Sequence, residues 1–134
     1  LTARYSKHCK TRVMHAPEIP GATELLKFLK ANGKIIYISS ATPQVELRVI
    51  VRFRGLFDFV SEAFGAPEIK ELHIKHILNC ETVDPSQLLV IGDSQIDRRA
   101  ALFHNCHFVG IGSSFSGFDC VRFENLRELQ NSLG

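Results

Sequence analysis

Two acidic residues follow the apolar run "LLVIG", and their spacing suggests metal chemistry. Asp93 comes directly after this run, and Asp97 follows four residues later. If a helix begins here, both carboxylates face the same edge of the fold, where two close negative charges resist ionisation unless a cation relieves them. Carboxylate oxygens suit a hard divalent ion, Mg²⁺ above all. The alternative is a structural role, with Asp93 capping the helix and Asp97 favouring its N-terminal dipole.

Hydroxyl groups follow a second apolar run, "IIYISSATP". Ser39 and Ser40 come directly after the predicted strand, and Thr42 lies at the start of the next predicted helix. Hydroxyls and backbone N–H groups at a helix start suit phosphate oxygens, although Ser and Thr also serve as ordinary helix caps. Ser39 and Ser40 are therefore candidate phosphate ligands.

A lysine supplies the third feature. Lys70, in "GAPEIK", falls in the first turn of a predicted helix, and helical side chains lean toward the helix N-terminus. Lys70 can therefore reach the strand ends, whereas Lys75 lies further down the same helix. A solvated surface lysine is the ordinary alternative. His73 and His76, on one face of this helix, have a spacing that permits a shared metal, but no third ligand is evident.

Alternating helices and strands must position these residues. This pattern predicts an α/β fold, a Rossmann-like three-layer arrangement with a parallel sheet between helices. Ligands of such sheets bind beyond the carboxyl ends of the strands, where the candidate residues fall. We expect helices over 22–33, 43–56, 67–80, 96–105 and 124–133, and strands over 34–39, 57–64, 87–92 and 107–112.

The first residues differ from the rest. Thr2 to about His15 reads as a polar helix, which the two prolines of "APEIPG" would end. The "APEIPG" stretch is the best candidate for a domain boundary. The chain does not begin with Met, so we expect further residues upstream.

Composition excludes several classes of protein. A net charge of +2 without a Lys/Arg run gives no reason to expect nucleic acid. No apolar stretch is long enough to cross a membrane, so no membrane partner is expected. Four cysteines without a C-x-x-C pair indicate reduced thiols and a cytoplasmic location.

Together, Ser39 in "YISSATP", Lys70 in "GAPEIK" and the acids of "IGDSQIDRRAA" resemble motifs two to four of the haloacid dehalogenase superfamily. The resemblance covers about residues 17–112 and is nearest to the phosphoglycolate-phosphatase-like and β-phosphoglucomutase-like branch. It implies that Ser39 binds the transferring phosphoryl group and that Lys70 offsets negative charge. It also implies that Asp93 holds Mg²⁺, supported by Asp97, and that residues 1–16 are a remnant of a helical cap, with 17–134 an incomplete core.

The first motif of that superfamily, D-x-D-x-[TV], is absent from this sequence. It supplies the nucleophile, which forms an aspartyl-phosphate, so no residue here can be named for that role. The resemblance also places the missing strand in the centre of the sheet, between "IIYIS" and "LLVIG". Unpaired buried backbone groups cost roughly 1–3 kcal/mol each. We therefore expect the slot to be filled by upstream residues, by direct pairing of the two strands, or by a partner chain, and favour the first.

The resemblance predicts a Mg²⁺-dependent phosphatase for a small phosphorylated metabolite, of which this chain is a fragment and inactive alone. A phosphomutase remains open, and the acid at Asp93 argues against a metal-free dehalogenase. The rival from another class is a non-catalytic domain, a pseudophosphatase or interaction module.

Overall fold

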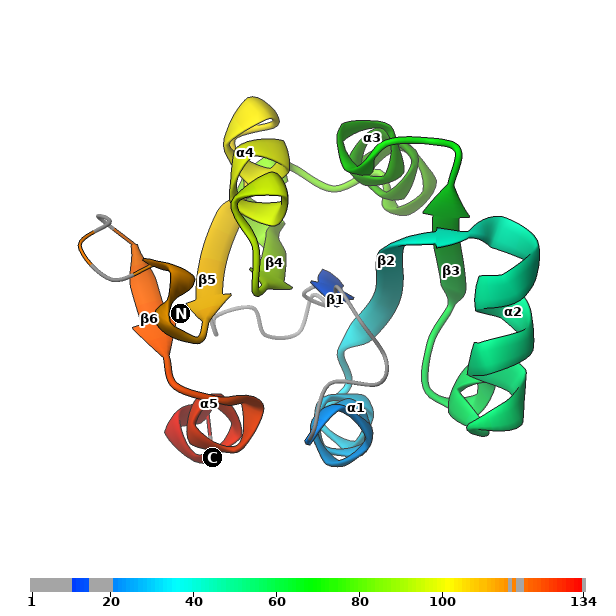
Figure 1. Ribbon diagram of the computed structural model, residues 1–134, viewed down its shortest axis with the longest axis horizontal. Coiled ribbons are helices and arrows are strands. Elements are labelled where there is room, and N and C mark those ends of the chain that lie inside the picture. The colour runs from blue at the N-terminus through cyan, green and yellow to red at the C-terminus, as the bar shows by residue number, and fades with distance from the viewer. Residues whose placement is uncertain (1–10, 15–20, 116, 118–119, 134) are drawn as a thin grey trace.

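A computed structural model describes residues 11–14, 21–115, 117 and 120–133 of the chain. Helices and strands alternate along it (Figure 1). The strands are β1 (Thr11–Met14), β2 (Ile35–Pro43), β3 (Glu62–Ala66), β4 (Leu88–Gly92), β5 (His107–Ile111) and β6 (Val121–Phe123). The helices are α1 (Ala22–Ala31), α2 (Gln44–Phe53), α3 (Lys70–Glu81), α4 (Gln95–Phe103) and α5 (Leu126–Leu133).

The strands form one parallel sheet in the order β3-β2-β1-β4-β5-β6. The chain therefore starts in the middle, winds outward to β3, and then crosses back to continue through β4 to β6. The carboxyl ends of β2 and β4 flank the carboxyl end of β1, which is the point where the winding reverses. The parallel sheet confirms the predicted α/β fold class. Open parallel sheets bind ligands at the point where the winding reverses.

The central strand corrects one expectation. The stretch predicted as a polar helix contains β1, and Thr11–Met14 pairs in parallel with both β2 and β4. The slot, which we expected residues upstream of this sequence to fill, is thus occupied by residues of the chain itself. Its position between β2 and β4 was predicted correctly. Backbone pairing on both sides satisfies groups that the open slot would have left unpaired. Residues 1–10 and 15–20, which include most of the proposed boundary, lie outside the described residues. The domain division therefore stays a prediction.

Two helical layers cover the sheet. Helices α1 and α5 lie over one face and α3 and α4 over the other, while α2 flanks β3 (Figure 1). Alternate residues of each strand supply the two cores. On β2, Ile36 and Ile38 pack toward the α1 and α5 layer, and Tyr37 packs toward α3 and α4. This alternation also decides which way the polar residues at the strand end point.

Several element boundaries differ from expectation. β2 extends to Pro43 instead of ending at residue 39, so Ser39, Ser40 and Thr42 all lie within it. Leu56–Asp58 forms a 3₁₀ turn, so β3 begins only at Glu62 rather than at residue 57. The three residues of β6 pair with β5 and extend the sheet by a strand that the sequence pattern left undefined. Among the described residues, no helix is long and apolar enough to span a membrane.

Candidate functional site

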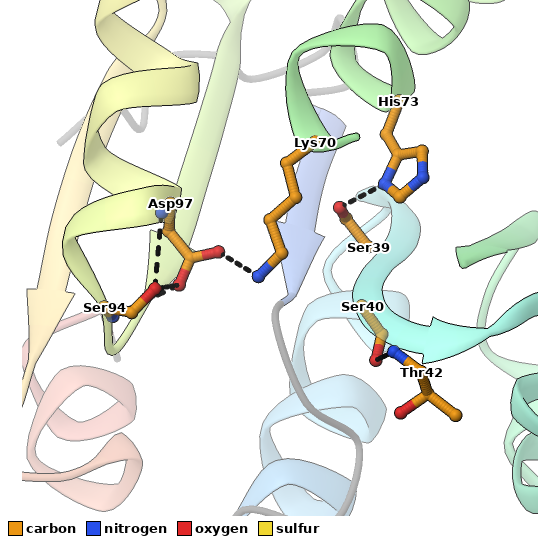
Figure 2. Close-up of polar contacts among 7 residues, drawn as sticks. All are labelled: Ser39, Ser40, Thr42, Lys70, His73, Ser94 and Asp97. Carbon is orange, nitrogen blue, oxygen red and sulfur yellow. Dashed lines mark hydrogen bonds and ion pairs between the residues drawn. The ribbon is translucent and has the colours of Figure 1, made fainter. Parts of the chain in front are cut away.

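A buried ion pair lies at the carboxyl edge of the sheet. Lys70 is the first residue of α3, and its Nζ lies 2.6 Å from Oδ1 of Asp97. The two side chains are 8% and 4% exposed, so the pair joins α3 to α4 away from solvent. Figure 2 shows the lysine extended toward Asp97. Lys70 therefore lies at the start of α3 with its ammonium group directed toward the start of α4.

The other oxygen of Asp97 is used locally. Oδ2 accepts hydrogen bonds from the backbone N–H of Ser94 at 3.2 Å and from its hydroxyl at 3.0 Å. In return, the Ser94 hydroxyl caps α4 by accepting the backbone N–H of Asp97. Such reciprocal capping fixes the first turn of a helix. Asp97 therefore holds Lys70 and starts α4, and a direct metal bond would compete with both contacts.

Gly92 explains how Asp97 comes so close to the strand end. A Cβ atom at this position would lie 2.5 Å from both Cγ and Oδ2 of Asp97. Side chains of any size would push the carboxylate away from β4. The glycine that precedes Asp93 is thus needed for close approach.

Ser39 is tied to a buried histidine. Its Oγ lies 2.7 Å from Nδ1 of His73, and Nε2 of the same ring lies 3.0 Å from the carbonyl oxygen of Gly65. The His73 ring is fully buried and stacks on Phe64 at 5.7 Å between ring centroids. Burial lowers the pKa of His73, more than the hydrogen bond to the Gly65 carbonyl raises it, so the neutral ring is favoured. Figure 2 shows Ser39 turned toward His73 rather than toward Lys70.

Ser40 points elsewhere, as the alternation of a strand requires. Its Oγ accepts the backbone N–H of Thr42 at 3.0 Å, and the residue is 5% exposed. Ser40 lines a pocket of about 450 Å³ together with Lys70 and Ser94. Apolar side chains form much of the remaining wall: Ala41, Ala66, Pro67, Ile69 and Ile96. Glu68 and Glu71 also line it, so the pocket combines one cation, two serines and two acidic residues with an apolar surface.

The predicted site residues are placed as follows. Lys70 and Asp97 are in contact, and Ser40 shares the pocket with Lys70. Ser39 lies behind this pocket and does not line it. Asp93 follows β4 directly and is half-buried beside the capping turn. The sequence pattern did not single out Ser94, although Ser followed three residues later by Asp is a recognisable capping signal.

Metal-binding capacity at this edge is modest. Within the described part of the chain, no three His, Cys, Asp or Glu side chains gather closely enough to hold a metal. Mg²⁺ in phosphate sites is usually held by one or two carboxylates, water and the substrate phosphate. Asp93 directly precedes Ser94, which lines the pocket, so a single carboxylate is available near it for such an arrangement. His76 pairs with Glu68 at 3.3 Å, and its ring stacks on Phe64, as the His73 ring does.

Sequence comparison gives a consistent result. Residues 3–104 match a family model described as haloacid dehalogenase-like hydrolase. A 5'-nucleotidase of Pseudomonas aeruginosa is 30% identical over 109 residues, which cover 76% of this chain and 48% of that protein. The chain thus spans about half the length of the curated relative that it matches.

Solved structures share the fold. A predicted phosphoglycolate phosphatase from Haemophilus somnus 129PT is 25% identical, with a TM-score of 0.77, over 87% of this chain and 57% of that one. The core domain of a Streptococcus pneumoniae TIGR4 protein, solved by NMR, has a TM-score of 0.75 at 14% identity. That likeness covers 92% of this chain and 94% of the core domain. The described sheet therefore matches a core domain in extent as well as in topology.

Proposed function

The chain belongs to the haloacid dehalogenase-like hydrolases, and from that premise we propose that it is the phosphate-binding part of a Mg²⁺-dependent phosphatase. The reaction is hydrolysis of a phosphoric monoester of a small metabolite. The matched 5'-nucleotidase makes a nucleoside monophosphate one candidate substrate. The matched predicted phosphoglycolate phosphatase makes a short phosphorylated acid another.

One observation carries this proposal. The ammonium group of Lys70 is buried at the point where the sheet winding reverses, and Lys70 lines a pocket together with Ser40, Ser94, Glu68 and Glu71. Cations and hydroxyl donors in a partly dry pocket stabilise the charge of a transferring phosphoryl group more strongly than they would in water. Asp97 keeps the Lys70 ammonium group in place through the 2.6 Å contact with its Oδ1.

The acidic residues have separate roles in this proposal. Asp93 would hold Mg²⁺, and the bound ion would neutralise charge on the phosphoryl oxygens. Asp97 would act through Lys70. The nucleophile expected from the family is not assigned to any residue, because the sequence has no D-x-D-x-[TV] motif. We therefore propose that the 134 residues alone bind phosphate but do not hydrolyse esters.

A non-catalytic role is the second candidate, and β1 favours it. The central strand, Thr11–Met14, contains no carboxylate. A domain that kept the phosphate pocket but has no nucleophile on this strand would bind phosphorylated ligands without turnover.

Hydrolysis of p-nitrophenyl phosphate by the full-length protein tests the proposed function. We expect hydrolysis that requires Mg²⁺ and that falls at least about 100-fold in Asp93→Asn, the scale seen when a charge-stabilising group is removed. Arg54→Gln, on the far side of α2, is the control. Activity that persists in a chelator or in Asp93→Asn would refute the role of Asp93. Phosphate binding without any turnover would favour the second candidate.

A further inference from the structure

We propose that His104 is a positioning residue for Lys70: it holds the first turn of α3 against the end of α4 and so fixes where the Lys70 ammonium group lies. This inference rests on the proposed function, in which Lys70 binds the phosphate. His104 acts through α3 and touches no ligand.

The backbone of His104 is fixed by the way α4 ends. Asn105, the next residue, adopts a left-handed conformation with a φ of 60°. Its backbone N–H donates to the carbonyl oxygen of Leu102 at 3.1 Å. The backbone N–H of Cys106 donates to the carbonyl oxygen of Ala101 at 2.9 Å. This pair of bonds is a Schellman motif, which closes a helix and satisfies its last carbonyl groups. The His104 side chain therefore starts from a defined position.

The imidazole ring of His104 reaches across to α3. Its Nε2 lies 2.8 Å from the carbonyl oxygen of Glu71, the residue after Lys70. A carbonyl oxygen can only accept a hydrogen bond, so Nε2 carries a proton and donates it. The Phe103 ring packs edge-on against the imidazole, with 4.9 Å between the ring centroids. These contacts keep the ring directed at the first turn of α3.

The first turn of α3 lacks the usual support of a capping side chain. Its N-cap residue is Ile69, and within the described part of the chain no side chain caps this helix. A helix start without a capping side chain is less stable, because its first N–H groups have fewer partners. Lys70 is the first residue of that turn. Movement of the turn would therefore displace the lysine.

Helix α4 supports this turn at two points. Near its start, Oδ1 of Asp97 lies 2.6 Å from Nζ of Lys70. At its end, the ring of His104 donates to the carbonyl group of the next residue of α3. The capping contacts of Ser94 fix the first turn of α4, and the Schellman motif fixes its last. One contact thus holds the Lys70 side chain, and the other holds the backbone beside it.

Phosphate binding by the 134-residue chain tests this assignment. The dissociation constant of inorganic phosphate is measured by NMR titration for the wild type, His104→Ala and His104→Gln, each alone and combined with Lys70→Met. We expect His104→Ala to weaken binding about three- to tenfold, the range for one hydrogen bond. His104→Gln has an amide N–H that can replace the one on Nε2, so it should bind within about twofold of the wild type. In the Lys70→Met background, His104→Ala should change the affinity less than about twofold, because the residue through which it acts is already lost.

Leu102→Ala is the matched control. It shortens a side chain that is 51% exposed in the last turn of α4 and keeps the backbone contacts of that turn. It should change phosphate affinity less than about twofold. Wild-type affinity in His104→Ala would overturn the proposal. A loss of the same size with and without Lys70 would also overturn it, because His104 would then act on the fold as a whole.

Nitrogen-15 relaxation of the Lys70 ammonium group is the second measurement, and it does not depend on phosphate. We expect this group to be ordered in the wild type and in His104→Gln, and more mobile in His104→Ala. Unchanged mobility in His104→Ala would overturn this inference while leaving the proposed function intact. Failure of the wild type to bind phosphate would instead remove the proposed function, and with it the role of Lys70 that His104 serves.

Discussion

Lys70 and Asp97 are 27 residues apart in the sequence, yet Nζ of one lies 2.6 Å from Oδ1 of the other. The contact joins the first turns of α3 and α4 across the carboxyl edge of the sheet. Both side chains are buried, so neither charge has water to stabilise it if its partner is lost. The same pair that places a cation in the pocket should therefore also determine stability.

Loss of one partner should destabilise the fold. We expect Asp97→Asn to lower the free energy of unfolding by about 3 kcal/mol, because the buried Lys70 loses the carboxylate that its ammonium group contacts, while the capping oxygen is retained. Urea unfolding measures this change. The double variant Lys70→Met, Asp97→Asn removes both charges and should recover part of the loss. An effect within about 0.5 kcal/mol for Asp97→Asn alone and for Lys70→Met alone would show that the pair behaves like an exposed one.

The close approach of the Asp97 side chain to Gly92 leads to a second prediction. Gly92→Ala should cost about 1–3 kcal/mol of stability, because the added methyl group overlaps the Asp97 carboxylate. It should also weaken phosphate binding, since Lys70 loses its anchor. Gly110→Ala is the matched control, because its methyl group would lie 2.7 Å from Cγ of Phe115, away from the pocket. Equal loss of phosphate affinity in both variants would show that the effect is unfolding alone.

His73 should make stability depend on pH. Burial lowers its pKa below the ordinary value, so the unfolded chain takes up a proton at a higher pH than the folded chain. Its contribution is present above about pH 6.5, the unfolded value, and is lost as the pH falls from there toward the lowered pKa of the folded state.

Urea unfolding at pH 7.5, 6.5 and 5.5 measures this dependence. The wild type should lose stability toward low pH, and His73→Gln should lose less across the same range. His76→Gln, which alters the exposed ring that pairs with Glu68, is the control and should keep the wild-type slope. An unchanged slope in His73→Gln would contradict a buried neutral ring.

Thiol reactivity provides a fourth prediction. Burial raises the pKa of Cys106 to about 12, whereas Cys80 is exposed. Because the thiolate is the reactive form, N-ethylmaleimide at pH 8 should modify Cys80 in the native protein and leave Cys106 unmodified until urea is added. Peptide mass spectrometry distinguishes the two. Comparable modification of both thiols in the native state would contradict the burial of Cys106.

Much of the architecture could be predicted because its signals are local. Apolar runs such as "LLVIG" identify buried strands, and parallel pairing then places the residues after them at one edge. Lys70 was expected at this edge because it falls in the first turn of a predicted helix, whose side chains lean toward the helix N-terminus. The pairing of Lys70 with Asp97 depends instead on how α3 and α4 sit relative to each other, which no local pattern specifies.

Two features could not be predicted for physical reasons. β1 has the sequence "TRVM", which contains too few apolar residues to indicate a buried strand, and its conformation is set by pairing with β2 and β4. Ser39 and Ser40 are chemically identical, so only strand alternation and the buried ring of His73 distinguish the residue that lines the pocket from the one behind it.

The central claim is that Lys70, Ser40 and Asp93 together bind one phosphate and one Mg²⁺. Calorimetric titration of the 134-residue chain with inorganic phosphate, with and without Mg²⁺, tests it most directly. We expect Mg²⁺ to tighten wild-type binding about tenfold, or about 1.4 kcal/mol. Asp93→Asn should abolish that gain, and Lys70→Met should weaken binding under both conditions. Phosphate affinity that is the same with and without Mg²⁺, or that is unchanged in Lys70→Met, would contradict the account.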